Sequence, residues 1–303
     1  MDYISIYKEI IVLFMIMGVG YFSSRLGVIT SSAADEISKL LMKVTLPALI
    51  IVSMNQTFNK ELLINSIGIL IISICVHVAF IFVAYLWSKW FDLPQEKMSV
   101  LRFLIIFGNT TFMGYPIINA VYGELGLFYA SSYNFVAILL IFSYGIILLS
   151  KRGSGSILKK LLNPGFIAVI VGYILFFMQI EFPYVILSSL QLVGNLTIPL
   201  ALIIIGNSLV SIPLKELFVD KQLWYVSLLR LIVIPVILLI ILKQLGLNNY
   251  LVGISVIMSA IPAALFAGVF ARTNGCDGNL GDRGAVLTHI LSIITIPLII
   301  YLL

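Results

Sequence analysis

Long runs of apolar residues, separated by short polar gaps, organise this chain. A helix needs about 20 mostly apolar residues to cross a bilayer, and ten segments meet that length approximately. They are 4–24, 37–54, 62–88, 99–121, 126–149, 164–180, 184–209, 223–243, 250–270 and 284–303. Gly, Asn and Pro residues interrupt the fourth and ninth of these segments. The pattern therefore predicts an all-α polytopic membrane protein with ten transmembrane helices, of which helices 4 and 9 are broken.

The residues that punctuate the apolar runs repeat once along the chain. A shift of 152 residues places Thr45-Leu46-Pro47 on Thr197-Ile198-Pro199, and Gly123 on Gly275. Each half then holds five spans. Because five is odd, the two halves must insert with opposite orientations. Two inverted five-helix repeats are typical of secondary transporters, whose substrate sites lie near the midplane where the repeats meet.

The repeat and the positive charges define the predicted organisation. We expect a first five-helix repeat at 1–150, a short loop at 151–163 and a second, inverted repeat at 164–303. The loop carries four Lys and Arg residues, which places it in the cytoplasm by the positive-inside rule. Alternation then puts twelve Lys and Arg residues inside and three outside. It also puts both termini on the outer side of the cell membrane.

Composition argues against soluble functions. The chain is 61% hydrophobic and 10% charged, whereas soluble domains average about 45–50% and 25%. Its net charge of +5 sits in gaps between spans, so it sets orientation and does not indicate nucleic-acid binding. Cys75 and Cys276 offer neither a metal spacing nor a disulfide framework. No Walker motif, Ser/His/Asp set or zinc spacing is present, so we expect no enzyme activity, no cofactor and no metal.

The most informative stretch is Gly-Asn-Thr-Thr-Phe-Met-Gly-Tyr-Pro at 108–116 in the fourth span. Pro116 lacks an N–H group and clashes with the carbonyl of Phe112. Unwinding frees backbone groups, which are tolerated at membrane depth only inside protein or along a wet cavity. A half-helix that starts near the break directs its positive dipole end into that cavity. Asn109 adds a neutral amide that can donate and accept hydrogen bonds.

The ninth span carries the corresponding interruption around Pro262. Breaks at matching positions of two halves are the best sequence indication of a transporter site. The alternative is a pair of ordinary kinked helices, because proline is common in membrane spans. The candidate substrate-binding residues are Gly108, Asn109, Thr110, Gly114, Pro116, Asn134, Pro262 and Ala263.

These features resemble the auxin efflux carrier family, the PIN-like transporters. The likeness rests on 108–116, the Pro262 span, the loop at 271–277 and the two Thr-x-Pro pairs, and it covers essentially the whole chain. It implies that the broken helices cross near the prolines, and that a transport domain moves against a scaffold. It also implies carriage of organic anions, with Asn109 in the place of the crossover Asn that contacts the substrate carboxylate. A homodimer formed through the scaffold is the partner expected from the family.

Two departures from the family pattern refine this expectation. The loop at 151–163 is short, unlike that of many plant members, which indicates a microbial form. Pro262 is followed by Ala-Ala-Leu-Phe, where many relatives carry a polar residue, often Asn. The second half-helix therefore has fewer side-chain donors, which puts a dicarboxylate substrate in doubt.

Ionisable residues inside spans are functional suspects by default. We expect Arg230 to extend to the membrane interface, with a role as counter-charge for an anion as the alternative. His77 and His289 are expected to be buried residues with satisfied hydrogen bonds, and the alternative is proton coupling. No Asp or Glu falls in the middle of a span. Because antiporters driven by carboxylates need such residues, a sodium–proton exchanger is disfavoured.

The sequence thus predicts a secondary transporter or facilitator for a small organic anion such as malate, malonate or an auxin-like acid. It would work by an elevator-type or rocking movement, with the anion and membrane lipid as its partners. One rival is a sodium-coupled symporter of bile-acid-like anions. Another is a membrane scaffold or sensor that transports nothing, although the chain carries no soluble signalling domain.

Overall fold

The computed structural model describes residues 3–150, 164–180, 182–210, 212, 214–217 and 219–303, and every regular element within them is helical. The loop predicted at 151–163 lies outside these residues. With η marking a π-helical turn, the elements are α1 (Tyr3–Arg25), α2 (Ser31–Leu40), η1 (Leu41–Thr45), α3 (Leu46–Met54), α4 (Lys60–Ser88), α5 (Gln95–Ile106), η2 (Thr110–Gly114), α6 (Tyr115–Leu140), η3 (Ile141–Gly145), α7 (Ile146–Leu149), α9 (Pro164–Met178), α10 (Tyr184–Asn195), α11 (Thr197–Val210), α12 (Leu214–Leu217), α13 (Lys221–Leu228), η4 (Leu229–Val233), α14 (Ile234–Gln244), α15 (Asn249–Ala260), α16 (Ala267–Thr273) and α17 (Gly278–Leu302).

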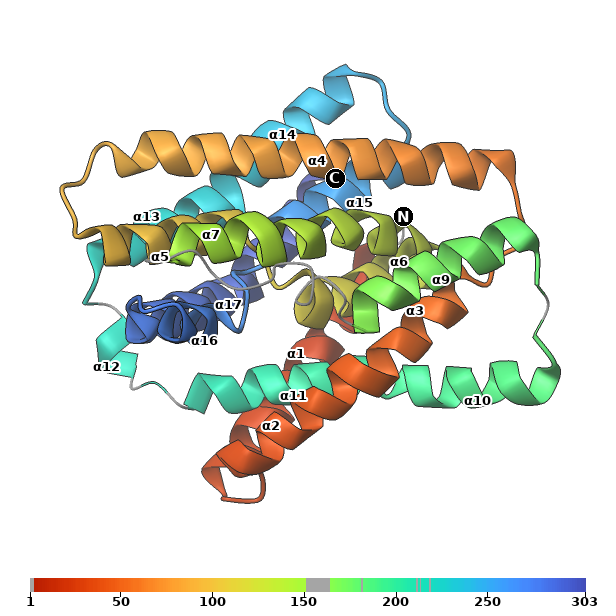
Figure 1. The fold of residues 1–303 in the computed structure, drawn as a ribbon, viewed down its shortest axis with the longest axis horizontal. Coiled ribbons are helices and arrows are strands. Elements are labelled where there is room, and N and C mark those ends of the chain that lie inside the picture. Colours follow the sequence, from red (N-terminus) through yellow and green to blue (C-terminus); the bar gives the residue numbers. More distant parts are fainter. Residues whose placement is uncertain (1–2, 151–163, 181, 211, 213, 218) are drawn as a thin grey trace.

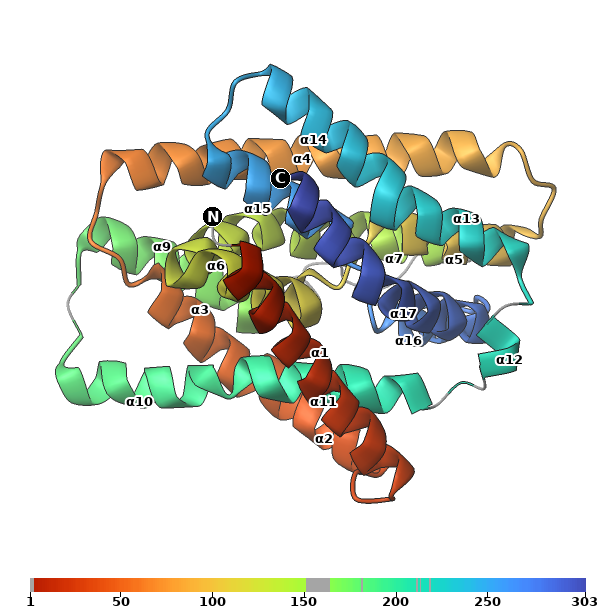
Figure 2. The same cartoon turned by 180° about the vertical axis from the view of Figure 1, so that it is seen from behind.

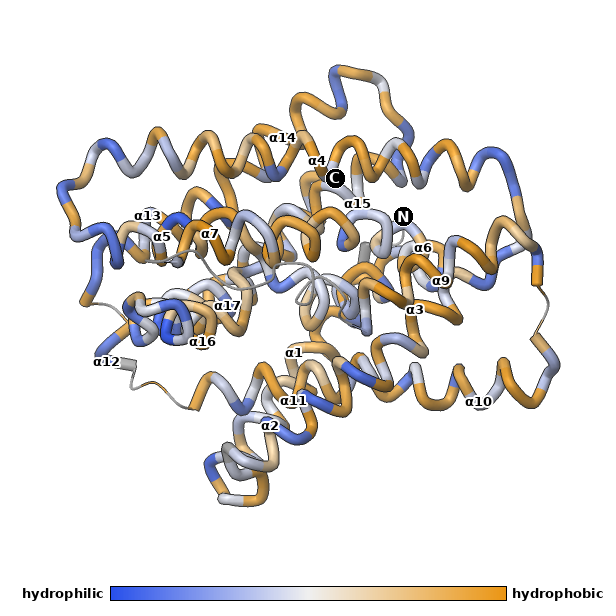
Figure 3. Tube along the Cα trace, in the orientation of Figure 1, coloured by the Kyte–Doolittle hydropathy of each residue, from blue (hydrophilic) through white to orange (hydrophobic). Residues whose placement is uncertain are grey.

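Length and hydropathy make these helices suited to a bilayer. In the described residues, seven helical stretches are long and apolar enough to cross a membrane: Ile6–Arg25, Ser32–Met54, Lys60–Ser88, Thr110–Leu149, Tyr184–Val210, Lys221–Gln244 and Gly278–Leu302. Two shorter apolar helices, α9 and α15, add to them. Figure 3 shows hydrophobic residues along α4, with hydrophilic residues gathered at its two ends. This is the pattern of a multi-pass membrane protein.

The two faces of α4 show the effect of lipid as a solvent. Ile67, Ile71, Val78 and Phe82 are exposed and recur at helical spacing. The opposite face buries polar side chains that bond within the protein, namely Asn65, Ser66, Ser73 and His77. A soluble helix shows the reverse distribution. In hydrocarbon, however, polar groups must be satisfied inside the bundle, which explains why α4 points them inward.

The 40-residue stretch Thr110–Leu149 folds back on itself at Gly123. This residue interrupts α6 with a φ of 61° and a ψ of −154°, which glycine adopts without steric cost. Thr110 and Asn134 lie on either side of it, and their side chains are 2.6 Å apart. An unbroken helix would separate them by about 36 Å. The stretch is therefore two packed helical arms, in the places where the sequence predicts spans four and five.

Figures 1 and 2 show α4 along one edge of the bundle and the α10–α11 pair along the opposite edge, with α5, α6, α7 and α17 between them. Helix α1 crosses α11 at very close range. Small residues permit this approach: a Cβ on Gly206 would overlap the backbone carbonyl of Met17, and one on Gly20 would overlap that of Ile203. Helix pairs in membranes associate through such small residues because lipid offers no hydrophobic driving force between them.

We predict that Gly206→Val severely destabilises the protein, because the new side chain meets backbone atoms of α1 that cannot rotate away. The expected loss is about 3 kcal/mol, seen as a lower melting temperature of the detergent-purified protein. Gly18→Ala is the matched control, since nothing lies within 4 Å of a Cβ at that position. Equal melting temperatures for the two variants would contradict the close packing of α1 on α11.

Candidate functional site

Two helices are interrupted near the centre of the bundle. The first interruption comprises Phe107–Asn109, between α5 and η2, and the second comprises Ile261–Phe266, between α15 and α16. Both fall in the segments that the sequence predicts to be broken. The first lies upstream of the place expected from Pro116, which occupies the first turn of α6. The π-helical turn η2 precedes it, and a widened turn of this kind accommodates a proline that an α-helix would exclude.

The two interruptions pair with each other as a short antiparallel bridge between Gly108 and Ala263. The Asn109 N–H donates to the carbonyl of Pro262 at 2.8 Å, and the Ala264 N–H donates to that of Phe107 at 2.9 Å. Unwound backbone at membrane depth needs partners inside the protein. Each broken segment supplies them to the other, which fixes how the two segments lie.

Helix α17 supports both interruptions with consecutive residues. Thr288 accepts a hydrogen bond from the Ala263 N–H at 3.0 Å. The next residue, His289, places Nε2 at 3.0 Å from Nδ2 of Asn109. Its Nδ1 lies 2.8 Å from the Ala285 carbonyl. A carbonyl oxygen can only accept, so Nδ1 carries the proton and Nε2 accepts from the Asn109 amide.

Asn109 is held in one orientation. It is 4% exposed, and its Oδ1 accepts the Phe112 N–H at 3.3 Å, capping the helix that follows. Because Nδ2 faces the acceptor nitrogen of His289, the amide cannot flip without losing both hydrogen bonds. One Nδ2 hydrogen remains beyond this pair, since an amide nitrogen carries two.

Asn134 joins the two arms of the segment that reverses at Gly123. Its Oδ1 accepts the Thr110 hydroxyl proton. Its Nδ2 donates to Thr111 Oγ1 at 3.3 Å and to the Tyr115 hydroxyl at 3.2 Å. Thr111 Oγ1 accepts in this contact, so its own proton can be donated elsewhere. Asn134 is fully buried, and it therefore braces the start of the broken helix.

The expectation that Arg230 extends to the membrane interface is wrong. Its side chain is 2% exposed. Nε donates to the Ile261 carbonyl at 2.9 Å, and one terminal nitrogen donates to the Ile105 carbonyl at 2.6 Å. The physical reason is the helix breaks, which leave carbonyls without helical partners near Arg230. The guanidinium donates hydrogen bonds to these carbonyls inside the bundle, so it does not extend to the interface.

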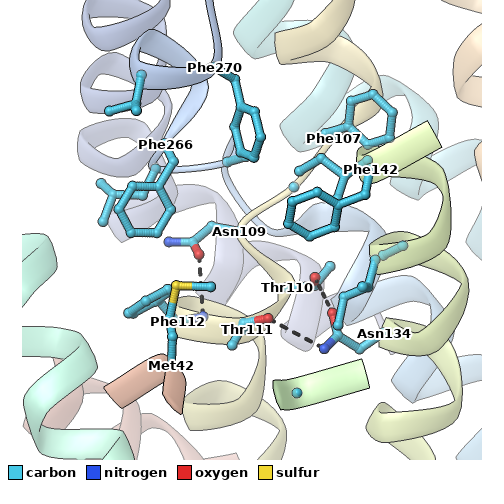
Figure 4. A pocket seen from close by; sticks show the side chains of 18 of the residues that line it. Met42, Phe107, Asn109, Thr110, Thr111, Phe112, Asn134, Phe142, Phe266 and Phe270 are labelled. Atoms are coloured by element: carbon cyan, nitrogen blue, oxygen red, sulfur yellow. Dashed lines mark hydrogen bonds between the residues drawn. The ribbon is translucent and has the colours of Figure 1, made fainter. Parts of the chain in front are cut away.

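A cavity of about 510 Å³ borders Asn109, Thr110 and Asn134. Figure 4 shows aromatic rings around it; Thr110 lies beside Asn134, and Asn109 lies between Phe266 and Phe112. The aromatic lining consists of Phe107, Phe112, Phe142, Phe266 and Phe270. The cavity also reaches Thr273 and Asn274, at the far end of α16. It therefore combines a small polar side with a large apolar one, as ligand sites commonly do.

Comparison with known proteins identifies the family to which the chain belongs. The model of the membrane transport protein family matches residues 5–158 and again residues 154–300. The chain belongs to this auxin efflux carrier-like family. The family resemblance predicted from the sequence is thereby confirmed, and the chain is a multi-pass membrane protein of a transporter family.

Its relatives are microbial transporters. An uncharacterized transporter of Methanocaldococcus jannaschii is 26% identical over 95% of this chain and 96% of its own length. Another, of Methanothermobacter thermautotrophicus, is 28% identical over 92% of both chains. The uncharacterized transporter YfdV of Escherichia coli is 23% identical over 97% of this chain and 96% of its own length. These matches run end to end, so the likeness covers the whole fold described above.

The eight candidate residues divide into two groups in the structure. Gly108, Asn109, Thr110 and Asn134 line the cavity. The other four are not among the residues that line it. Gly114 faces Met258 and Ile261, Pro116 is buried in α6, and Pro262 and Ala263 engage in the backbone bridge. Four of the eight candidate residues thus line the cavity, and the other four do not.

Several residues of the site escape sequence reasoning. The five phenylalanines come from five separate segments, and only Phe266 and Phe270 carry a signal, a four-residue spacing. His289 is buried and hydrogen-bonded, as expected, but its contact with Asn109 links residues 180 positions apart. His77 also satisfies its expectation by bonding to the Ser73 carbonyl at 2.7 Å. It is not among the residues that line the cavity.

Proposed function

We propose that the protein is a secondary transporter for a small organic anion, which binds in the cavity beside Asn109. The observation that carries this proposal is the cavity itself. It borders two broken helices at matching positions of the chain, and polar donors gather on one side of it. Interrupted helices that meet near the membrane midplane are the usual place of transporter sites.

The polar side of the cavity suits a carboxylate. Thr110 and Thr111 begin η2, so by position their N–H groups have no carbonyl one turn back. The Asn109 amide and the Thr111 hydroxyl each keep one proton that their printed contacts do not use, and both residues line the cavity. Helix N-termini attract anions because their dipoles leave about half a positive charge there. No described Asp or Glu is buried, so no carboxylate in these residues competes with the substrate at the site.

The apolar side of the cavity favours a substrate with a carbon body. Ala263-Ala264-Leu265-Phe266 offers no side-chain donor, and five phenylalanines line much of the remaining space. A second carboxylate placed among these rings would lose its hydration without gaining partners. We therefore propose a monocarboxylate with an aromatic or branched apolar part, ahead of malate or malonate.

The mechanism proposed is an elevator-type or rocking movement of two inverted five-helix repeats. One observation supports the repeat, and a second indicates which side is open. Gly123 and Gly275, which the shift of 152 residues superposes, have φ angles of 61° and 81°, and each precedes a long helical arm beyond its break. The cavity extends toward Thr273 and Asn274, the end that the positive-inside rule assigns to the cytoplasm. The conformation described would then be open to the cytoplasmic side.

A ligand screen by thermal stability tests this proposal. A ligand that binds the folded state raises its melting temperature. We expect indole-3-acetate to stabilise the purified protein more than malonate or malate, without sodium. Stabilisation only in the presence of sodium would favour the symporter of bile-acid-like anions. A protein that neither binds nor moves any carboxylate would fit the scaffold or sensor instead.

The phenylalanines allow a sharper prediction about substrate class. Phe266→Ala should weaken binding of indole-3-acetate by roughly tenfold. Burial of a large ring is worth about 1.5–3 kcal/mol, and truncation of the Phe266 side chain loses part of that contribution. Binding of acetate should change little. Phe82→Ala is the matched control, since Phe82 is 60% exposed on α4. Equal losses for both acids would contradict an apolar site for the substrate body. Titration of the melting temperature with each acid gives the comparison.

A further inference from the structure

Arg230 is a positive charge in the middle of the bundle, and no buried carboxylate accompanies it in the part of the chain that the structure describes. Among the described residues it is the only Lys, Arg, Asp or Glu that is buried. A buried charge is costly unless it is paired and hydrogen-bonded. The π-helical turn η4 carries it, and turns of this kind are frequent at functional sites. Groups other than a carboxylate must therefore balance the charge of Arg230.

The partners of Arg230 are the C-terminal ends of two helices. Ile105 lies in the last turn of α5, and Ile261 directly follows α15. Both carbonyls accept hydrogen bonds from the guanidinium. A helix C-terminus carries about half a negative charge, so two of them together balance one guanidinium. The ring of Phe80, 5.0 Å from the guanidinium carbon, adds a cation–π contact.

Carbonyls at helix C-terminal ends can also bind ions. In secondary transporters, unwound backbone carbonyls and half-helix C-terminal ends hold the sodium ion or proton that drives transport. Here the guanidinium fills the space between the two ends. Gly108 makes room for it, because a Cβ at that position would overlap a terminal nitrogen of Arg230. The place that a coupling cation would use is thus occupied by a cation that belongs to the chain.

We propose that Arg230 is a tethered substitute for a coupling cation: it neutralises both helix ends permanently, so the carrier needs neither sodium nor potassium. The inference rests on the proposed transport function and adds the ion requirement of the same site. It also assigns Arg230 a role other than counter-charge for the substrate, because its charge is already balanced by the helix ends. Removal of the guanidinium should turn the vacated space into a site for a free cation.

The test uses the full-length purified protein without substrate. Melting temperatures are measured in choline chloride and after its replacement by sodium, potassium or millimolar guanidinium chloride at constant ionic strength. We expect no saturable response from the wild type. Arg230→Ala should melt at least about 5 °C lower in choline, because two charge-assisted hydrogen bonds are lost. It should recover at least half of that loss, saturably, with guanidinium or sodium. Arg102→Ala, which removes an arginine bound to Ser88, should show no such recovery.

Two further variants keep the test decisive if Arg230→Ala does not fold. Arg230→Lys retains the charge and should keep most of the wild-type melting temperature, whereas Arg230→Met should not. Equal stability of these two variants would overturn the proposal, as would saturable stabilisation of the wild type by sodium. Failure of both cations to restore Arg230→Ala would also overturn it. Because no substrate is present, these outcomes are independent of whether the protein carries an organic anion.

Discussion

Asn109→Asp should abolish binding of the organic anion while leaving the fold intact. The substitution keeps the shape of the side chain and its acceptor oxygen, which caps the helix at the Phe112 N–H. It replaces the donor nitrogen with a negative charge at the place where the substrate carboxylate is proposed to bind. Two like charges about 4 Å apart repel by roughly 4 kcal/mol at an effective dielectric constant of 20. We expect at least a 100-fold weaker binding constant, measured by thermal titration with the acid that the wild type binds.

Asn65→Ala is the matched control for this prediction. Asn65 is also a buried amide, 6% exposed, and it bonds to the Tyr129 hydroxyl and to Asn248. It is not among the residues that line the cavity. This variant should lose stability but keep the binding constant. If Asn109→Asp bound the acid as tightly as Asn65→Ala, the substrate site would lie elsewhere.

Gly108→Ala should disable transport and lower stability together. Its new methyl group overlaps the Arg230 guanidinium, which two hydrogen bonds hold in place. Either those bonds break or the backbone bridge between Gly108 and Ala263 opens. Loss of hydrogen bonds from a charged donor costs about 1.5–3 kcal/mol each. We expect a loss of at least about 3 kcal/mol, measured by chemical or thermal unfolding.

A double variant separates this explanation from a general intolerance of alanine. Arg230→Lys removes the planar end of the side chain, so Gly108→Ala should be less harmful in that background. Gly68→Ala is the control for the glycine itself, because its Cβ would meet only the flexible end of Leu251, at 2.9 Å. Purely additive losses in the double variant would contradict direct contact between the two residues.

Much of the fold could be predicted from the sequence because lipid imposes simple rules. Apolar runs of about 20 residues predict helices, because a helix satisfies all its backbone hydrogen bonds within one segment and so can cross hydrocarbon. The break near Gly108 followed from the clustering of glycine, asparagine and proline. Its position shifted by several residues, because Pro116 is absorbed by a π-helical turn. The sequence does not reveal that adjustment, because a π-helical turn differs from an α-helical one only in having its hydrogen bonds one residue further along the chain.

The support of the site was harder to predict, because it depends on contacts between distant segments. Asn109 and Asn134 carried local signals, the motif at 108–116 and a polar cluster in an apolar helix. Nothing in the sequence near His289 points to Asn109, and the two meet only once α17 is packed. The expectation that Arg230 reaches the interface is wrong for a related reason. A single arginine near a span end commonly extends to the interface, and only the positions of Ile105 and Ile261 show why this one does not.

Counterflow in proteoliposomes tests the central claim most directly. Vesicles are loaded with the unlabelled acid that stabilises the purified protein, and uptake of the same labelled acid is followed without sodium, a pH gradient or a membrane potential. A carrier exchanges the two pools, so the label should accumulate transiently in vesicles that contain the wild type or Asn65→Ala. Vesicles with Asn109→Asp should not accumulate it. Equal accumulation in the presence of Asn109→Asp, or none with the wild type, would contradict transport of an organic anion through the cavity beside Asn109.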